Sequence, residues 1–372
     1  MTLPIVHLHG TPYEQGVQHG RQLRDRIAHN LGVYFDRFER EAKVPRADVL
    51  VRARQYGEAI AAHNADYYAA MQGVADGSGF SLPELIALNV RYEILYYQFG
   101  VLALAAEVAA GHPERPEPDG CTAFAVLPEA SANGHLLVGQ NWDWIPQVQG
   151  AVLHTVEQDG LETLSFTEAG IVGGKIGFNS AGVALAINGM TTTDDDWSRL
   201  SKPFHVRCYE ILRSRSFDAA VNVVTGLDRA CSTNFLIAQT PDQVVDIEAA
   251  PDKVQLLQCE NDCLVHTNHF VDPNGLGVVE PPSERRPYSR LRRERLTELL
   301  GLKRPIAVAD LQHYLQDHQE HPFGICRHED PEGLPEEQYI TVTAVVMDVE
   351  TRTLHLTDGP PCQSSYQQVS LG

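Results

Sequence analysis

Apolar side chains in the first 110 residues recur every three or four positions, the spacing of one buried face of an α-helix. The clearest run extends from Tyr13 to Ala42. Helix-start signals precede it, with Thr11 as an N-cap, Pro12 at the first helical position and Glu14 completing a capping box. The pattern predicts helices over residues 13–42, 47–77 and 82–105.

From Cys121 onward the pattern changes to short apolar runs separated by turn sequences, which is typical of β-sheets. Asn133-Gly134 and Asp159-Gly160 separate consecutive runs and favour hairpin turns. We expect strands over 121–127, 136–142, 152–158, 163–166, 175–178, 183–187, 233–239, 243–249, 253–258, 263–267, 340–349 and 352–357, and helices over 202–214, 217–226, 284–300 and 307–317. Many strands between helical layers predict an α+β fold of two stacked sheets with helices outside.

One boundary interrupts these patterns. Residues 111–120 contain three prolines and several charges, which predicts an exposed, turn-rich loop between the helical part and the strands. A chain of 372 residues is long enough for two or three domains, but mixed α/β enzymes of this length often form one large core. We therefore expect residues 1–120 and 121–372 to belong to one integrated globular unit.

The charge balance argues against two classes of partner. The formal net charge is -20, from 49 acidic and 29 basic residues. A surface of this kind repels phosphate backbones and anionic lipid headgroups, so neither nucleic acid nor a membrane is the expected partner. No apolar run approaches the ~18 residues that span a bilayer, and the first residues lack a signal-peptide pattern. The expected location is the cytoplasm.

Cys121 is the residue whose position first suggests chemistry. The seven cysteines are scattered and odd in number, so a disulfide framework is not expected in a large chain without an export signal. Cys121 follows the polar loop directly and begins an apolar strand. Taken alone, this position favours an inert buried thiol, because free cysteine is among the most buried residue types.

Several ordered segments change that interpretation. The chain closely resembles the isopenicillin-N acyltransferase family in a set of segments: Gly10–Gly16 with His19-Gly20, Asp119–Phe124 followed by Gly139–Trp144, Thr167–Val183, His266–His269 and Pro322–Arg327. The matches keep the same order from residue 9 to about 330 and so cover most of the chain. Short pieces such as Asn141-Trp142-Asp143 are weak signals singly, whereas the ordered set is specific.

The resemblance implies an N-terminal-nucleophile hydrolase with a four-layer αββα sandwich. It implies a precursor that cuts itself at Gly120–Cys121 into a helical fragment, 1–120, and a catalytic fragment, 121–372, which stay associated. The thiol would attack the preceding carbonyl of a strained peptide bond, and water would open the resulting thioester. The boundary seen independently in the hydrophobic pattern falls at the same place.

The resemblance also implies a role for each candidate site residue. Freed Cys121 would be the nucleophile, and its α-amine, with a pKa near ~7.7–8.0, would accept the thiol proton. Asp143 would orient that amine, and the Asn268 amide would stabilise the oxyanion. Arg327 would lower the thiol pKa or bind a substrate carboxylate. Asn188 is a candidate substrate-binding residue of the pocket.

Substrate identity is the property that can least be carried over from the family to this chain. The spacing from Cys121 to Asp143 is longer than expected for the fungal enzyme of the family, and the pair Gly173-Gly174 adds a residue before Lys175. The expected substrate is therefore a small N-acyl amide or an acyl thioester in general. No cofactor is expected, although a coenzyme A thioester is an allowed co-substrate, and water or an amine takes the acyl group.

Two other readings stay open. Cys259, Cys263, His266 and His269 have spacings reminiscent of a zinc-dependent hydrolase. On a continued strand, however, His266 and His269 would point to opposite faces, so no metal site is expected there. The second alternative is a non-catalytic binding protein that retains the fold. The acidic run at 194–196 is interpreted as a solvated loop.

Overall fold

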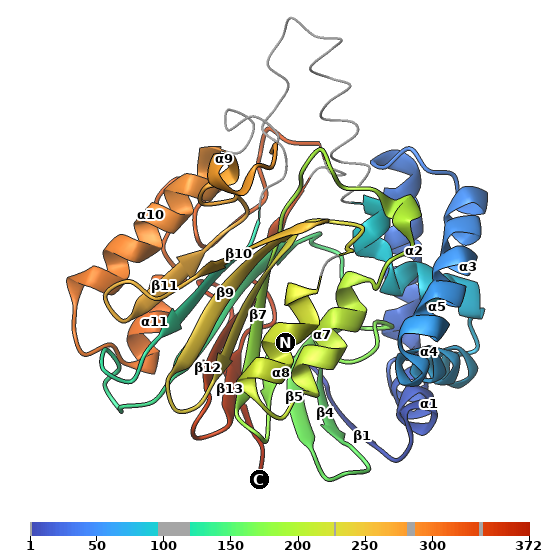
Figure 1. The fold of residues 1–372 in the computed structure, drawn as a ribbon, viewed down its shortest axis with the longest axis horizontal. Helices are drawn as coiled ribbons and strands as arrows, with labels where there is room; N and C mark the ends of the chain where they lie inside the picture. Colours follow the sequence, from blue (N-terminus) through green and yellow to red (C-terminus); the bar gives the residue numbers. More distant parts are fainter. Residues whose placement is uncertain (1, 96–119, 227, 281–286, 335–337) are drawn as a thin grey trace, which may run out of the picture.

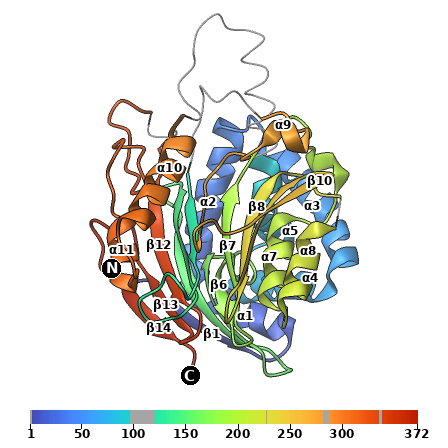
Figure 2. The ribbon, with the colours of Figure 1, turned by 60° about the vertical axis from the view of Figure 1, so that its left-hand side comes forward.

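Two β-sheets face each other at the centre of the structure (Figure 1, Figure 2), a computed structural model that describes residues 2–95, 120–226, 228–280, 287–334 and 338–372. Within these residues one sheet has eight strands, in the order β1-β4-β5-β6-β7-β8-β9-β10. The other has six, in the order β11-β2-β3-β12-β13-β14. Neighbouring strands are antiparallel except β1 and β4, which are parallel.

The eight strands of the first sheet are β1 (Ile5–His9), β4 (Gly150–Val156), β5 (Glu162–Glu168), β6 (Ile176–Asn179), β7 (Val183–Gly189), β8 (Thr233–Gln239), β9 (Gln243–Ala250) and β10 (Lys253–Leu257). Those of the second are β2 (Thr122–Val126), β3 (Leu137–Trp144), β11 (Cys263–His266), β12 (Ile340–Asp348), β13 (Thr353–Leu356) and β14 (Gln367–Ser370). The twelve predicted strands are all observed, with ends that agree within two residues. Among the strands of the described residues, β1 and β14 are the two that were not predicted.

Helices cover the outer faces of both sheets. On the eight-stranded sheet, α7 (Phe204–Leu212) packs on β6 and β7, and α8 (Phe217–Thr225) packs on β8 and β9. On the six-stranded sheet, α10 (Pro287–Leu302) packs on β11 and α11 (Val308–Tyr314) packs on β12. The sheets meet each other through β2 and β3 of one and β7 and β8 of the other. The predicted four-layer αββα sandwich of the α+β class is therefore confirmed.

The helices of residues 12–89 gather beside the β1 edge of the eight-stranded sheet (blue in Figure 1). They are α1 (Pro12–Gln22), α2 (Arg24–Arg40), α3 (Arg46–His63), α4 (Ala65–Ser78) and α5 (Leu82–Asn89). Short elements elsewhere are the 3-10 helix η1 (Trp197–Arg199) and α9 (Pro273–Leu276).

The predicted long helices are interrupted. The expected helix over 13–42 is wrong as one element, because α1 ends at Gln22 and α2 begins at Arg24. The helix over 47–77 divides at Asn64, whose side-chain oxygen accepts a hydrogen bond from the Tyr67 N–H (2.9 Å) and so starts a new helix. Of the third, α5 ends at Asn89, and residues beyond 95 lie outside the described part.

Two glycines explain how closely α1 and α4 approach. A Cβ atom at Gly16 would lie 2.1 Å from the Ala70 carbonyl oxygen, and one at Gly73 would lie 2.1 Å from that of Tyr13. Real atoms do not come this close, so any larger residue would push the helices apart. The two helices therefore pack backbone against backbone.

A buried charge cluster joins the helical part to the sheets. Glu168, at the end of β5, forms ion pairs with Arg91 and Lys175 and accepts a hydrogen bond from the Tyr34 hydroxyl. Tyr34 in turn accepts one from the Trp144 indole N–H (2.7 Å). Tyr34 and Arg91 precede residue 120, whereas the other members follow it. One hydrophobic core also contains residues from both parts of the chain.

The charges of this cluster follow from two cations sharing one carboxylate. Burial favours neutral Glu168, but Arg91 and Lys175 outweigh burial and hold the pKa of the carboxyl at about 2. Burial, together with the neighbouring Arg91, lowers the pKa of Lys175 to about 7 although Glu168 opposes this shift. The Lys175 ammonium group also lies 3.3 Å from the centroid of the Trp142 ring.

Among the described residues, no helix has both the length and the apolar character that crossing a bilayer requires.

Replacing Glu168 should destabilise the fold strongly. The Glu168→Gln substitution leaves two buried cations without their carboxylate, and we expect the free energy of unfolding to fall by about 3–5 kcal/mol. Urea denaturation measures this change. The matched control is Glu162→Gln on the same strand, where a partly exposed carboxylate pairs with His154, and a loss of at most about 1 kcal/mol is expected. Equal losses for the two variants would contradict a dominant role for the cluster.

Candidate active site

Cys121 lies immediately before β2 in an uncommon backbone conformation. Its φ angle is +38°, in the left-handed region that residues with a side chain rarely adopt. Its thiol is buried, and Sγ lies 3.9 Å from the carbonyl oxygen of Asp143 on the adjacent strand β3. Conformations of this kind cost about 1–3 kcal/mol and persist where the surrounding structure holds them. The peptide at the predicted cleavage point is therefore followed by a strained residue.

Gly120 packs directly on Asp143. A Cβ atom at position 120 would lie 2.9 Å from the Asp143 carbonyl oxygen and 3.0 Å from its Cβ atom. Because backbone cannot move away as a flexible side chain can, this contact requires the glycine. The structure thus brings together Gly120, Cys121 and Asp143, three of the residues that the sequence analysis selected.

Asp143 is held from the neighbouring strand β12. It is buried, and its Oδ1 accepts a hydrogen bond of 2.7 Å from the Thr341 hydroxyl. Thr341 is the residue that pairs with Asp143 across β3 and β12, and a register irregularity follows between Thr341 and Thr343. The carboxylate is fixed at the edge of the Cys121 environment by a side chain that the sequence analysis did not select.

The same threonine also positions Arg327. The Thr341 hydroxyl oxygen accepts a hydrogen bond from the Arg327 backbone N–H (2.9 Å). The Thr341 backbone N–H donates to the Arg327 carbonyl oxygen (3.1 Å). The buried guanidinium group donates to the Tyr339 carbonyl (3.3 Å) and lies 5.2 Å from the centroid of the Phe323 ring. Thr341 therefore connects Asp143 with Arg327. The alternation of Thr341 and Thr343 with apolar residues was the only signal for it.

Arg292 connects Cys121 with Asn268. From α10 its guanidinium group donates to the Cys121 carbonyl oxygen (2.7 Å), to the Thr122 hydroxyl (2.9 Å) and to Asn268 Oδ1 (3.1 Å). Asn268 Nδ2 donates to the Gly189 carbonyl oxygen (2.9 Å). The sequence analysis missed Arg292 because it lies among several arginines of one helix, and nothing in that spacing distinguishes the buried one.

The surroundings of the Cys121 thiol favour its protonated form. Burial raises its pKa to about 12, and the carboxylate of Asp143 acts in the same direction. A backbone contact with Asp143, Arg292 and Lys175 oppose the shift without reversing it. A thiol with this pKa is a poor nucleophile at neutral pH, because the thiolate is the reactive form.

Asn188 belongs to a buried polar network on β7 and its neighbours. Its Oδ1 accepts a hydrogen bond from Asn234 Nδ2 (3.1 Å) and lies 3.3 Å from His266 Nδ1. His266 bonds in turn to Glu248 (2.9 Å). Burial alone would lower the pKa of His266, but Asp246 and Glu248 raise it above its ordinary value. Within the described residues, Asn188 Nδ2 is buried without a hydrogen-bond partner.

The four residues of the zinc alternative do not gather around a common point. His266 contacts Glu248, His269 Nδ1 contacts the Ser289 hydroxyl (2.8 Å), and Arg304 contacts Cys263. Among the described residues, Cys259, Cys263, His266 and His269 form no group whose ligand atoms converge. The strand on which the two histidines would point to opposite faces does not continue to His269. Because β11 ends at His266, their rings are stacked with centroids 6.5 Å apart.

Comparison with solved structures finds similar chains at low identity. An N-acylethanolamine-hydrolyzing acid amidase ortholog of Caenorhabditis elegans aligns with a TM-score of 0.46 and 15% identity over 68% of this chain and 100% of that one. A variant of the conjugated bile acid hydrolase of Clostridium perfringens aligns with a TM-score of 0.48 and 10% identity over 67% and 92% of the two chains.

Comparison with curated proteins finds several relatives, including the following two. The chain is 27% identical over 330 residues to the 40 kDa form of acyl-coenzyme A:6-aminopenicillanic-acid-acyltransferase from Emericella nidulans. The alignment covers 87% of this chain and 84% of the relative. It is 24% identical over 255 residues to an uncharacterized protein of Archaeoglobus fulgidus, which covers 63% of this chain but only 40% of the relative.

The model of one protein family matches residues 130–361, more than half of the chain, and its description is acyl-coenzyme A:6-aminopenicillanic acid acyl-transferase. The match agrees with the resemblance read from the ordered sequence segments. The chain belongs to the acyl-coenzyme A:6-aminopenicillanic acid acyl-transferase family.

Proposed function

We propose that the protein is a self-processing cysteine enzyme that hydrolyses small N-acyl amides or transfers acyl groups through an acyl-enzyme on Cys121. Family membership supports the coarser statement, an enzyme of acyl transfer or amide hydrolysis. The observation that carries the finer assignment is the contact of Gly120 and Cys121 with Asp143. Cys121 is buried and strained, and it follows a position where the close approach of Asp143 leaves no room for a side chain.

The proposed self-cleavage begins with attack of Cys121 Sγ on the Gly120 carbonyl carbon. The C–S bond forms, the peptide C–N bond breaks, and the thiol proton passes to the leaving nitrogen, which becomes the α-amine of Cys121. Water then hydrolyses the thioester, leaving a carboxylate on Gly120 and a free thiol. The left-handed conformation of Cys121 supports this step, because relief of strain lowers the barrier. Glycine on the acyl side leaves room for the attacking sulfur.

Cleavage also supplies the base that the buried thiol lacks. In the intact chain the pKa of Cys121 is raised to about 12. A freed α-amine has a pKa near ~7.7–8.0, so it can accept the thiol proton and later return it to the leaving group. The close approach of residue 120 to the Asp143 Cβ atom supports a role for this aspartate in orienting the new amine and stabilising its charge.

Asn268 and Arg292 are proposed to form the part of the site that stabilises the oxyanion. Arg292 holds both the Cys121 carbonyl and Asn268 Oδ1, so it fixes the asparagine relative to the nucleophile. One hydrogen of the Asn268 amide is donated to Gly189. A side-chain amide N–H donor is the type of group that stabilises a developing negative charge.

Arg327 and Asn188 are proposed to contact the substrate. The buried Arg327 guanidinium group suits a carboxylate, and the Asn188 Nδ2 is a buried donor. Water or an amine as acceptor decides between hydrolysis and transfer, and a coenzyme A thioester is the proposed co-substrate for transfer. After cleavage the fragments 1–120 and 121–372 would stay associated, because the Glu168 cluster and the shared core join them.

The nucleophile assignment predicts a simple gel result. Wild type should separate into two bands under denaturing conditions, and N-terminal analysis of the larger should read Cys-Thr-Ala-Phe. Cys121→Ala should stay as one band at 41.1 kDa, because no thiol can attack Gly120. Cys263→Ala, which alters a partly buried cysteine at the start of β11, is the control and should be cut. Cleavage of Cys121→Ala, or an uncut and active wild type, would overturn the proposal.

The oxyanion assignment predicts a loss of kcat. Asn268→Ala should lower kcat by about 10²–10³-fold on a chromogenic N-acyl anilide, because one transition-state donor is removed. Its KM should change much less. Asn274→Ala, an exposed position on α9, should leave both constants unchanged. A normal kcat in cleaved Asn268→Ala protein would show that this amide does not stabilise the oxyanion.

Thr341 should be needed to position Asp143 and Arg327. Thr341→Val keeps the shape but removes two hydrogen bonds, and we expect unfolding free energy to fall by about 1–3 kcal/mol together with a lower kcat. The nearby Thr343 is equally buried, but its hydroxyl has no partner in the described part of the chain. Thr343→Val should therefore be neutral or stabilising in the same denaturation assay. Identical behaviour of the two variants would refute the positioning role.

A further inference from the structure

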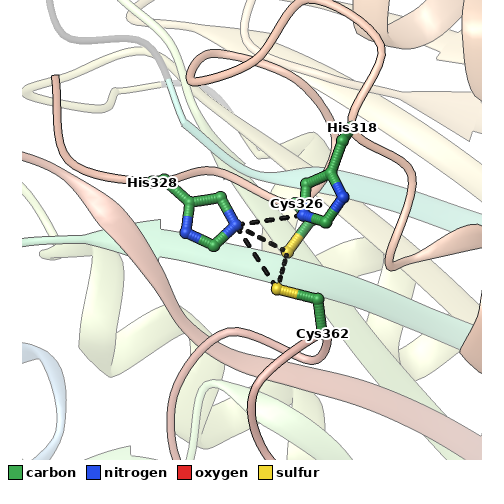
Figure 3. A group of neighbouring side chains, drawn as sticks. All are labelled: His318, Cys326, His328 and Cys362. Carbon is green, nitrogen blue, oxygen red and sulfur yellow. Dashed lines mark hydrogen bonds between the residues drawn. The ribbon is translucent and has the colours of Figure 1, made fainter.

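Four side chains with metal-binding atoms converge beside the Arg327 segment. His318, Cys326 and His328 come from the segment that follows α11, and Cys362 comes from the segment that follows β13 (Figure 3). Their ligand atoms all lie within 4.8 Å of one another. None of the four takes part in the reaction proposed above.

Four of the six separations between these atoms are close to those around a tetrahedral ion, and the two between His318 and the sulfur atoms are within 4.8 Å. The two sulfur atoms are 3.5 Å apart, and the Nε2 atoms of His318 and His328 are 3.1 Å apart. His328 Nε2 lies 3.5 Å from Cys326 Sγ and 3.4 Å from Cys362 Sγ. Around a tetrahedral Zn²⁺ with Zn–S near 2.3 Å and Zn–N near 2.0–2.1 Å, the separations are about 3.8 Å for S···S, 3.3 Å for N···N and 3.5 Å for S···N.

The donor set selects the ion. Two thiolates and two imidazoles in tetrahedral geometry are the ligands of structural Zn²⁺ sites. A disulfide between Cys326 and Cys362 would need the sulfurs at about 2.05 Å, much closer than they lie. We propose that His318, Cys326, His328 and Cys362 form a structural Zn²⁺ site. With four protein ligands, no position stays open for a substrate or a reactive water.

The site has a clear mechanical role in this fold. Two of the ligands, Cys326 and His328, directly flank Arg327, so an ion would fix the backbone on both sides of that residue. Cys362 would tie this segment to the one after β13. Cys326 is buried, whereas His318 and Cys362 are exposed, so the ion can enter from solvent. The His321 ring lies 5.2 Å from that of His328 and stays outside the set of four.

Metal analysis of the full chain tests the proposal without any substrate. Protein purified from zinc-supplemented cells and dialysed against metal-free buffer should retain about one Zn²⁺ per chain by mass spectrometry. Cys362→Ser, at an exposed position, and His328→Ala should retain below about 0.1 Zn²⁺ per chain. Cys259→Ser and Cys263→Ser are matched controls and should keep the ion. Cys121→Ala should also keep it, which separates this proposal from the proposed reaction.

Cobalt supplies a second readout on wild-type protein. Co²⁺ added after removal of zinc should give thiolate charge-transfer and intense visible bands typical of tetrahedral sulfur and nitrogen ligation. A Zn²⁺ content below about 0.1 per chain together with no such bands would overturn the proposal. So would loss of zinc in Cys259→Ser with retention in Cys362→Ser. An intact mass showing a Cys326–Cys362 disulfide in freshly prepared, metal-free wild type would favour a redox pair instead.

Discussion

The contact between residue 120 and Asp143 is the constraint on which the rest of the site depends. A side chain at position 120 would overlap the Asp143 backbone, and Cys121 just after it is held in a left-handed conformation. Asp143 cannot retreat, because β3 is paired on both sides and Thr341 holds its carboxylate. Two longer links complete the arrangement: Arg292 joins Cys121 to Asn268, and Thr341 joins Asp143 to Arg327. Within the described residues, the strain at the proposed cleavage point is thus maintained by paired strands and by Arg292 of α10.

Hydrophobic patterns predicted much of the fold, and the elements that they did not predict have physical explanations. Each predicted strand lay between turn residues and carried enough apolar positions to be recognised. The strand β1 was not predicted because its partner β4 is distant in sequence and parallel, so no local turn sequence indicates the pairing. The break at Asn64 was not predicted because the helical periodicity continues across it. The side chain of Asn64 nevertheless caps a new helix at this position.

The site was predictable only where a residue stands in a motif. Gly120, Cys121, Asp143, Asn268 and Arg327 could be selected from ordered segments, and the structure joins them by short hydrogen-bonded links. Arg292 and Thr341 could not, because an arginine in a charged helix and a threonine in a strand look ordinary until burial is known. The cluster of His318, Cys326, His328 and Cys362 was missed for a related reason. Its last member lies on a different segment, so no compact spacing reveals it.

The central claim is that the reactive group is Cys121 together with an amine that exists only after cleavage. Intact-mass spectrometry after brief exposure to an activated acyl ester tests this claim most directly. One acyl group should appear on the fragment that begins at Cys121, and none on uncut chain in the same sample. Equal acylation of the uncut chain, or an acyl group on another residue of the cut protein, would contradict the account.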